Sequence, residues 1–207
     1  MSVKSENNKR IAKNTFLLYF RMLFTMGVSL YTSRVVLNTL GVEDFGIYNV
    51  VGGVVVMFSF LNSSLATATQ RFLNYEMGQG NALKLEKVFS IALTGHYLIA
   101  LSVILLAETI GLWFVSTQLE IPAERMHAAL WVYQFSILTL AVSIISVPYN
   151  AVIIAHERMK VFAYVSIAEV SLKLTVVFLL VYLSFDKLVL YAFLLLVYGD
   201  EYMDDLC

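Results

Sequence analysis

Long, uninterrupted apolar runs limit what this sequence can fold into more than any other feature. A bilayer core about 30 Å thick is crossed by roughly 20 residues of helix. The runs lie at approximately 14–38, 45–71, 88–115, 127–155, 161–184 and 188–198. They are continuous rather than alternating, and lipid accepts only helices or closed barrels. The sequence therefore predicts an all-α integral membrane protein, an antiparallel transmembrane helix bundle with five full spans and a truncated sixth.

The composition agrees with a membrane protein. Hydrophobic residues make up 59% of the chain and charged residues 14%, and the mean hydropathy is +0.77. Soluble domains carry about a quarter charged residues, so this chain has too few charges to cover a surface that faces water. Cys207 is the single cysteine, which excludes an internal disulfide framework and a cysteine-rich metal site.

The two ends of the chain differ from the membrane region 14–198. Residues 1–13 are basic and are predicted to form a cytoplasmic N-terminus. The last apolar run, 188–198, would be about 16 Å long as a helix, half of a membrane. It is followed by the atypical acidic tail 199–207. We expect a chain interrupted inside its sixth helix, by truncation or by a frameshift.

Lysines and arginines orient the bundle. The N-terminal head holds four of them, the region between spans 2 and 3 three, and the region between spans 4 and 5 two. The opposite loops hold Arg125 and Lys187. Since positive charges concentrate on the cytoplasmic side, the N-terminus is predicted to be cytoplasmic.

Ionisable side chains at membrane depth usually face a protein interior or a water-filled cavity. Arg21 lies about two turns inside span 1, and at 100° per residue it shares one polar stripe with Asn14, Thr25 and Thr32. One interpretation is an arginine that lines a cavity and holds a phosphate with two hydrogen bonds. The other is an arginine whose long side chain reaches back to the lipid headgroups.

Three further charged residues are weaker candidates. Arg34 lies near the outer end of span 1, where snorkelling or a helix contact explains it as well as a ligand does. Glu169 and Lys173 are four residues apart in span 5, with the acid first. That order favours an intrahelical pair, and a pair that lines a charged cavity is the alternative.

Polar residues also gather on spans 2 and 4. The cytoplasmic half of span 2, which includes Asn62 and Gln70, is too polar to face lipid. Span 4 carries small polar residues on one helical face, either for close helix packing or as the wall of a hydrated cavity. They are Ser136, Thr139, Ser143, Ser146 and Asn150.

Several kinds of chemistry have no sequence support. No Walker A motif, nucleophile elbow or His-Glu-x-x-His zinc motif occurs, so we expect neither an enzyme nor a cofactor. Tyr202-Met203-Asp204-Asp205 matches a reverse-transcriptase signature. It lacks strands and a basic channel, and no nucleic-acid partner is expected.

Two stretches carry a resemblance to a known family. Residues 33–76 read SRVVLNTLGVEDFGIYNVVGGVVVMFSFLNSSLATATQRFLNYE, and residues 143–160 read SIISVPYNAVIIAHERMK. Both resemble the polysaccharide-export flippases of the multidrug/oligosaccharidyl-lipid/polysaccharide (MATE-like) superfamily, in particular the Wzx-like branch of Bacteroides-like bacteria. Leu-Gly-Val-Glu-Asp-Phe-Gly-Ile-Tyr, from residue 40, and Gln70-Arg71-Phe72 are the most specific parts.

The resemblance implies the N-terminal lobe of a two-lobed transporter that rocks around a central cationic cavity. Its substrate would be an undecaprenyl-diphosphate-linked oligosaccharide, moved across the inner membrane for surface polysaccharide. Partners would be membrane lipid and the polysaccharide polymerase machinery. Cavity arginines hold the diphosphate in related flippases, and Arg21 matches that role better than Arg34. Because alternating access needs two lobes, this chain is not expected to transport unaided.

Two alternatives stay open. A MATE-type cation or drug antiporter would favour carboxylates in its cavity, whereas the membrane-embedded charge here leans basic: Arg21, Arg34 and Lys173 against Glu108 and Glu169. A membrane enzyme acting on polyprenyl lipids usually carries acidic or histidine residues on sizeable loops, and the loops here are short.

Overall fold

The structure is a computed structural model. It describes residues 2–80, 82–156, 159–182 and 186–198, with side chains for all of these except 2–11, 13, 14, 60–63, 82, 159–162 and 198. The elements in chain order are α1 (Ser2–Gly78), α2 (Ala82–Leu106), the π-helical η1 (Ala107–Gly111), α3 (Leu112–Thr117), α4 (Met126–Ala155), α5 (Met159–Tyr182) and α6 (Lys187–Tyr198). The prediction of an all-helical chain is confirmed for these residues, none of which forms a strand.

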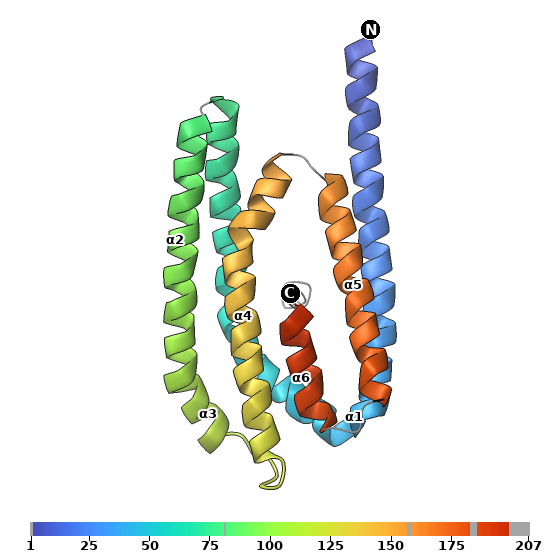
Figure 1. Ribbon diagram of the computed structural model, residues 1–207, viewed down its shortest axis with the longest axis vertical. Helices are drawn as coiled ribbons and strands as arrows, with labels where there is room; N and C mark the ends of the chain where they lie inside the picture. The colour runs from blue at the N-terminus through green and yellow to red at the C-terminus, as the bar shows by residue number, and fades with distance from the viewer. Residues whose placement is uncertain (1, 81, 157–158, 183–185, 199–207) are drawn as a thin grey trace.

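A sharp reversal at Gly41 divides α1 into two arms that run in opposite directions (Figure 1). Gly41 has φ 80° and ψ 171°, a left-handed conformation that only glycine adopts at little cost. Residues 2–40 and 42–78 are therefore called the first and second arms of α1. The sequence predicted a loop of several residues here, but one glycine suffices for the reversal.

Four helical segments are long and apolar enough to cross a membrane among the described residues: Thr15–Gly78, Leu83–Thr117, Met126–Ala155 and Ala163–Tyr182. Large apolar side chains also cover the outside, as at Phe16, Leu98 and Trp113, which are 69%, 62% and 57% exposed. Helices that are apolar on every side are typical of membrane spans. The first five predicted runs lie in α1, in the continuous helix from α2 to α3, in α4 and in α5, and the shortened run 188–198 lies in α6; residues 183 and 184 lie outside the described ones.

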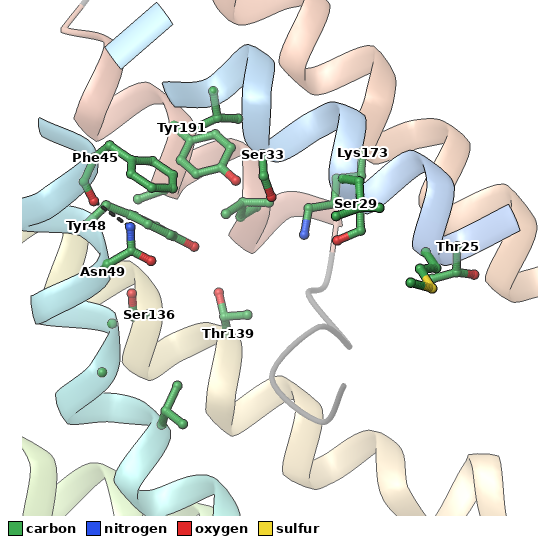
Figure 2. A pocket seen from close by; sticks show the side chains of 18 of the residues that line it. Thr25, Ser29, Ser33, Phe45, Tyr48, Asn49, Ser136, Thr139, Lys173 and Tyr191 are labelled. Carbon is green, nitrogen blue, oxygen red and sulfur yellow. Dashed lines mark hydrogen bonds between the residues drawn. The ribbon is translucent and has the colours of Figure 1, made fainter. Parts of the chain in front are cut away.

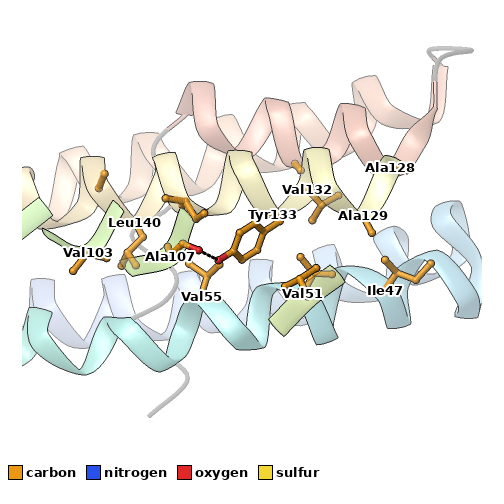
Figure 3. Packing of buried hydrophobic residues seen from close by; sticks show 14 of the residues in the cluster. Ile47, Val51, Val55, Val103, Ala107, Ala128, Ala129, Val132, Tyr133 and Leu140 are labelled. Carbon is orange, nitrogen blue, oxygen red and sulfur yellow. Dashed lines mark hydrogen bonds between the residues drawn. The ribbon is translucent and has the colours of Figure 1, made fainter. Parts of the chain in front are cut away.

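The bundle has two packed cores, and α6 belongs to both. One core joins the second arm of α1 to α2, α3 and α4, with Val51, Val103 and Ile137 among its buried residues (Figure 3). The other joins the first arm of α1 to α5, through Val36 and Leu180. Leu188 and Ala192 of α6 pack into the first core, and Tyr191 and Leu195 into the second. The space between the two cores is thus bounded by α6.

A π-helical turn joins α2 to α3 and is in contact with Tyr133 of α4. The Oη of Tyr133 donates a hydrogen bond of 2.8 Å to the carbonyl oxygen of Ala107 (Figure 3). That carbonyl also accepts from the backbone N–H of Leu112, five residues on. A Cβ added to Gly111 would overlap the Tyr133 hydroxyl. The wider turn therefore depends on a glycine where the tyrosine reaches the backbone.

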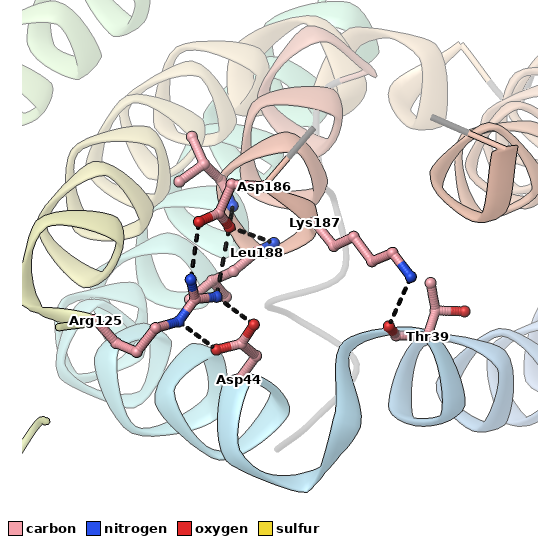
Figure 4. Close-up of polar contacts among 7 residues, drawn as sticks. Thr39, Asp44, Arg125, Asp186, Lys187 and Leu188 are labelled. Carbon is pink, nitrogen blue, oxygen red and sulfur yellow. Dashed lines mark hydrogen bonds and ion pairs between the residues drawn. The ribbon is translucent and has the colours of Figure 1, made fainter. Parts of the chain in front are cut away.

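Arg125 joins three helix ends near the reversal of α1 (Figure 4). Its Nε donates to Oδ1 of Asp44 at 2.8 Å and its Nη1 to Oδ2 of Asp186 at 2.9 Å, and Nη2 is paired with Oδ2 of Asp44. Asp186 caps α6, because its Oδ1 accepts from the backbone N–H of Leu188 at 3.1 Å. The hydrogen bond to Asp44 is the main cause that raises the pKa of Arg125. Asp44, Arg125 and Asp186 are called the Arg125 cluster below.

Candidate functional site

A cavity of about 920 Å³ lies between the two cores. Both arms of α1 line it, together with α4, α5 and α6 (Figure 2). Ligand pockets commonly measure about 300–1,000 Å³, so this one is large enough for a substantial ligand. It is also lined by residues that are far apart in the sequence, which only the folded bundle brings together.

A ladder of polar side chains runs along the first arm of α1 into this cavity. It consists of Arg21, Thr25, Ser29 and Ser33, each four residues after the last. Such a spacing keeps side chains on neighbouring parts of one helical face. The ladder rises about 18 Å along the helix, from Arg21 toward the reversal at Gly41.

A second basic side chain enters the cavity from α5. Lys173 lines the cavity together with Ser29 (Figure 2). Arg21 and Lys173 are both half-buried. None of the lining residues that the structure describes is acidic. Two basic side chains among the lining residues favour an anionic ligand and raise the cost of bringing in a cation.

The end of the cavity nearest the reversal is aromatic. Phe45 and Tyr48 come from the second arm of α1, and Tyr191 comes from α6 (Figure 2). The rings of Tyr48 and Tyr191 meet edge to face, with centroids 5.0 Å apart and planes at 62°. Aromatic pairs prefer this geometry, so the contact holds the two rings in place.

Polar groups at this aromatic end present acceptor oxygens. The Nδ2 of Asn49 donates to the carbonyl oxygen of Phe45 at 2.7 Å, which orients the amide. The hydroxyls of Ser136 and Thr139 donate to the helix carbonyls of Val132 and Phe135, at 2.8 and 2.9 Å. A hydroxyl whose proton is used in this way still offers its oxygen lone pairs as acceptors.

Gly52 and Gly53 widen the cavity wall on the second arm of α1. Both line the cavity, and a Cβ added to either would meet no other atom within 4 Å. The absence of side chains here leaves space rather than allowing close helix packing. Larger residues at these positions would fill the cavity without disturbing a packed contact.

The predicted site residues separate into two groups. Arg21, Thr25 and Lys173 line the cavity together. Four others are described but are not among the residues that line it, namely Arg34, Gln70, Asn150 and Glu169. The side chain of Asn62 lies outside the described side chains. Of the predicted stripe on span 1, Thr32 is buried and 3% exposed but does not line the cavity either.

Sequence reasoning missed several lining residues. Ser29 and Ser33 extend the ladder from Arg21 at intervals of four, and this period was a signal available in the sequence. Tyr48 and Asn49 lie about two turns after the Gly41 reversal, and Tyr191 lies about one turn into α6. No local pattern distinguishes these from ordinary apolar helix residues, because their common position results from the tertiary fold.

Comparison of the chain with models of known protein families, with curated protein sequences and with solved structures finds no match. Among the described residues, no group of three histidine, cysteine, aspartate or glutamate side chains is placed to hold a metal ion. The function is therefore inferred from the residues that line the cavity.

Proposed function

We propose that this chain is a multi-pass membrane bundle that binds an anionic, lipid-linked substrate, and that it is one lobe of a flippase for undecaprenyl-diphosphate-linked oligosaccharides. The cavity supports this proposal most directly, since two basic side chains, Arg21 and Lys173, line it. A diphosphate offers several acceptor oxygens to such side chains, and charge-assisted hydrogen bonds are the strong ones.

The proposal includes five membrane crossings. A straight helix of 64 residues, the length of Thr15–Gly78, would measure about 96 Å, three times the thickness of a bilayer core. The reversal at Gly41 supports one crossing for each arm of α1. The combined helix Leu83–Thr117, α4 and α5 would supply the other three, and α6 is too short to cross alone. The basic N-terminal head supports a cytoplasmic N-terminus.

The geometry fits a substrate that enters from the cytoplasmic leaflet. With the N-terminus inside, Arg21 would lie about two turns below the cytoplasmic surface, where a lipid diphosphate can reach it. The polyprenyl chain would remain in the surrounding lipid, against the apolar outside of the bundle. A second helical lobe would complete the site and rock against this one, as alternating access requires.

A cation or drug antiporter is less well supported. Binding an organic cation in a poorly hydrated cavity calls for a carboxylate, and Glu169 is not among the described residues that line this one. A lipid-modifying enzyme would need a nucleophile or a general base facing the lipid headgroup, and the polar side chains of the described lining are hydroxyl, amide and basic groups.

The proposal is tested by lipid binding to the 207-residue chain in nanodiscs, followed by native mass spectrometry. Undecaprenyl diphosphate is the probe, and undecaprenol is the neutral lipid with the same chain. We expect the diphosphate to bind more tightly, and Arg21→Ala to weaken its binding about 10-fold or more. Arg34→Ala is the matched control, because Arg34 belongs to the same arm but does not line the cavity. Equal binding of both lipids, or equal effects of both variants, would exclude Arg21 from the site.

A further inference from the structure

The two ends of the cavity differ in chemistry. Arg21 and Lys173 provide hydrogen-bond donors with positive charge, whereas the end near the reversal has aromatic rings and neutral acceptor oxygens. One kind of ligand group cannot satisfy both ends. A ligand that fills the cavity must therefore be anionic at one end and neutral at the other.

Three classes of group fit the aromatic end poorly. A phosphate would find only neutral hydroxyl and amide groups there, whereas Arg21 and Lys173 offer it positive charge. An alkyl chain would leave the acceptor oxygens of Asn49 and Ser136 without hydrogen bonds, a costly arrangement in a cavity away from water. An organic cation would have to enter a cavity whose described charged lining residues, Arg21 and Lys173, are both basic.

A hexose ring satisfies every requirement of this end. Its hydroxyl groups are donors that the acceptor oxygens of Asn49, Ser136 and Thr139 can bind. Its carbon–hydrogen faces are apolar and can lie against the rings of Phe45, Tyr48 or Tyr191, which combine an apolar surface with a polar tip. The open wall at Gly52 and Gly53 supplies space beside these groups.

We infer that the cavity end formed by Phe45, Tyr48, Asn49, Ser136 and Tyr191 is a subsite for a neutral hexose, adjacent to the anion-binding end at Arg21 and Lys173. This inference rests on the proposed function, because it assigns the sugar of the lipid-linked substrate to the same cavity. The order of the two ends also matches the substrate, in which the diphosphate lies between the lipid and the first sugar.

The test compares two lipids that differ by one sugar, undecaprenyl diphosphate and undecaprenyl-diphosphate-linked N-acetylglucosamine. Both are titrated into nanodiscs that contain the whole chain. The unmodified protein should bind the glycosylated lipid about 10-fold more tightly. Tyr48→Leu should remove this preference, because it should weaken the binding of the glycosylated lipid more than that of undecaprenyl diphosphate. Tyr97→Leu, on the exposed side of α2, is the matched control and should retain the preference.

A second variant is needed because Tyr48 packs against the buried Tyr191, so that Tyr48→Leu can also disturb the fold. Asn49→Ala combined with Ser136→Ala removes two acceptors and little volume, and it should lower the preference for the glycosylated lipid about fivefold. If both lipids bind equally to the unmodified protein, or weaken equally in these variants, the sugar subsite is wrong. Arg21→Ala distinguishes that result from failure of the proposed function, since it should weaken both lipids whether or not the sugar subsite exists.

Discussion

The guanidinium of Arg125 lies 2.9 Å from the carboxylate of Asp186, measured from Nη1 to Oδ2, and so ties the start of α4 to the start of α6. The same guanidinium holds Asp44, just beyond the reversal of α1. Lys187 completes the connection, because its Nζ lies 3.5 Å from the carbonyl oxygen of Thr39 (Figure 4). These contacts lie at the end of the bundle where the aromatic part of the cavity is found.

Removing one partner of the Arg125 cluster should destabilise the bundle. Asp44→Asn is expected to lower the free energy of unfolding by about 1–2 kcal/mol, because it replaces a charge-assisted bidentate contact that is largely shielded from water. Glu43→Gln, at the exposed neighbouring position, should change it by less than about 0.5 kcal/mol. Thermal unfolding in detergent measures both. Equal effects would show that the cluster does not stabilise the fold.

The contribution of Arg125 should not depend on pH in the neutral and alkaline range. The hydrogen bond to Asp44 raises the pKa of Arg125 above its ordinary value, so the folded protein holds this proton more tightly than the unfolded chain. Stability from a raised pKa is fully present below the unfolded value and is lost only above it. The difference in stability between the unmodified protein and Arg125→Ala should therefore be the same at pH 7 and pH 10.

Gly111 should tolerate no side chain while Tyr133 is present. Gly111→Ala places a methyl group against the Tyr133 hydroxyl, and overpacking of this kind costs about 1–3 kcal/mol. Gly95→Ala in α2, where a Cβ meets no other atom within 4 Å, should be neutral or stabilising. Adding Tyr133→Phe to Gly111→Ala should restore much of the stability that Gly111→Ala removes. A double-mutant cycle on unfolding temperatures measures this coupling, and additive effects would contradict it.

The reversal at Gly41 and the turn after Gly78 should lie on opposite sides of the membrane. In a chain with Cys207→Ser, single cysteines are introduced at Val42, which is 81% exposed, and at Gln79. A membrane-impermeant maleimide should label Val42→Cys from the outside of cells and Gln79→Cys only in inverted vesicles. Labelling of both from the same side would contradict five crossings.

Filling the cavity at its glycine wall should block the ligand and leave the fold intact. Gly53→Leu projects a side chain into space that no described atom occupies, and it should weaken the binding of undecaprenyl diphosphate about 10-fold or more. Gly27→Leu lies on the first arm of α1, also meets nothing within 4 Å and does not line the cavity. It should bind undecaprenyl diphosphate as tightly as the unmodified chain does. If Gly53→Leu also binds this lipid as tightly as the unmodified chain, the ligand lies outside this cavity.

Local chemistry explains why some features could be predicted from the sequence. Apolar length identified the helices, and Arg21, Thr25 and Lys173 stood out because charged and polar groups are rare at membrane depth. The Arg125 cluster was not predicted, although the sequence run around Asp44 had been singled out. Asp44 and Asp186 lie 81 and 61 residues away from Arg125 in the chain, and no local spacing predicts such a contact.

The aromatic end of the cavity could not be predicted for a related reason. Tyr48 and Tyr191 are ordinary residues within apolar helices, and they meet only because α1 reverses at a single glycine and α6 packs into both cores. The π-helical turn could not be predicted either. Neither Gly111 nor Tyr133 stands out in the sequence, and the two residues come into contact only in the folded bundle.

The central claim is that the cavity selects anions, and competition between an anionic and a cationic ligand tests it most directly. Binding of undecaprenyl diphosphate and of tetraphenylphosphonium is measured on the same nanodisc preparations. We predict that the unmodified chain binds the diphosphate and not the cation, and that Arg21→Glu combined with Lys173→Glu abolishes diphosphate binding. Tighter binding of tetraphenylphosphonium by the unmodified chain would contradict this account and favour a cation antiporter.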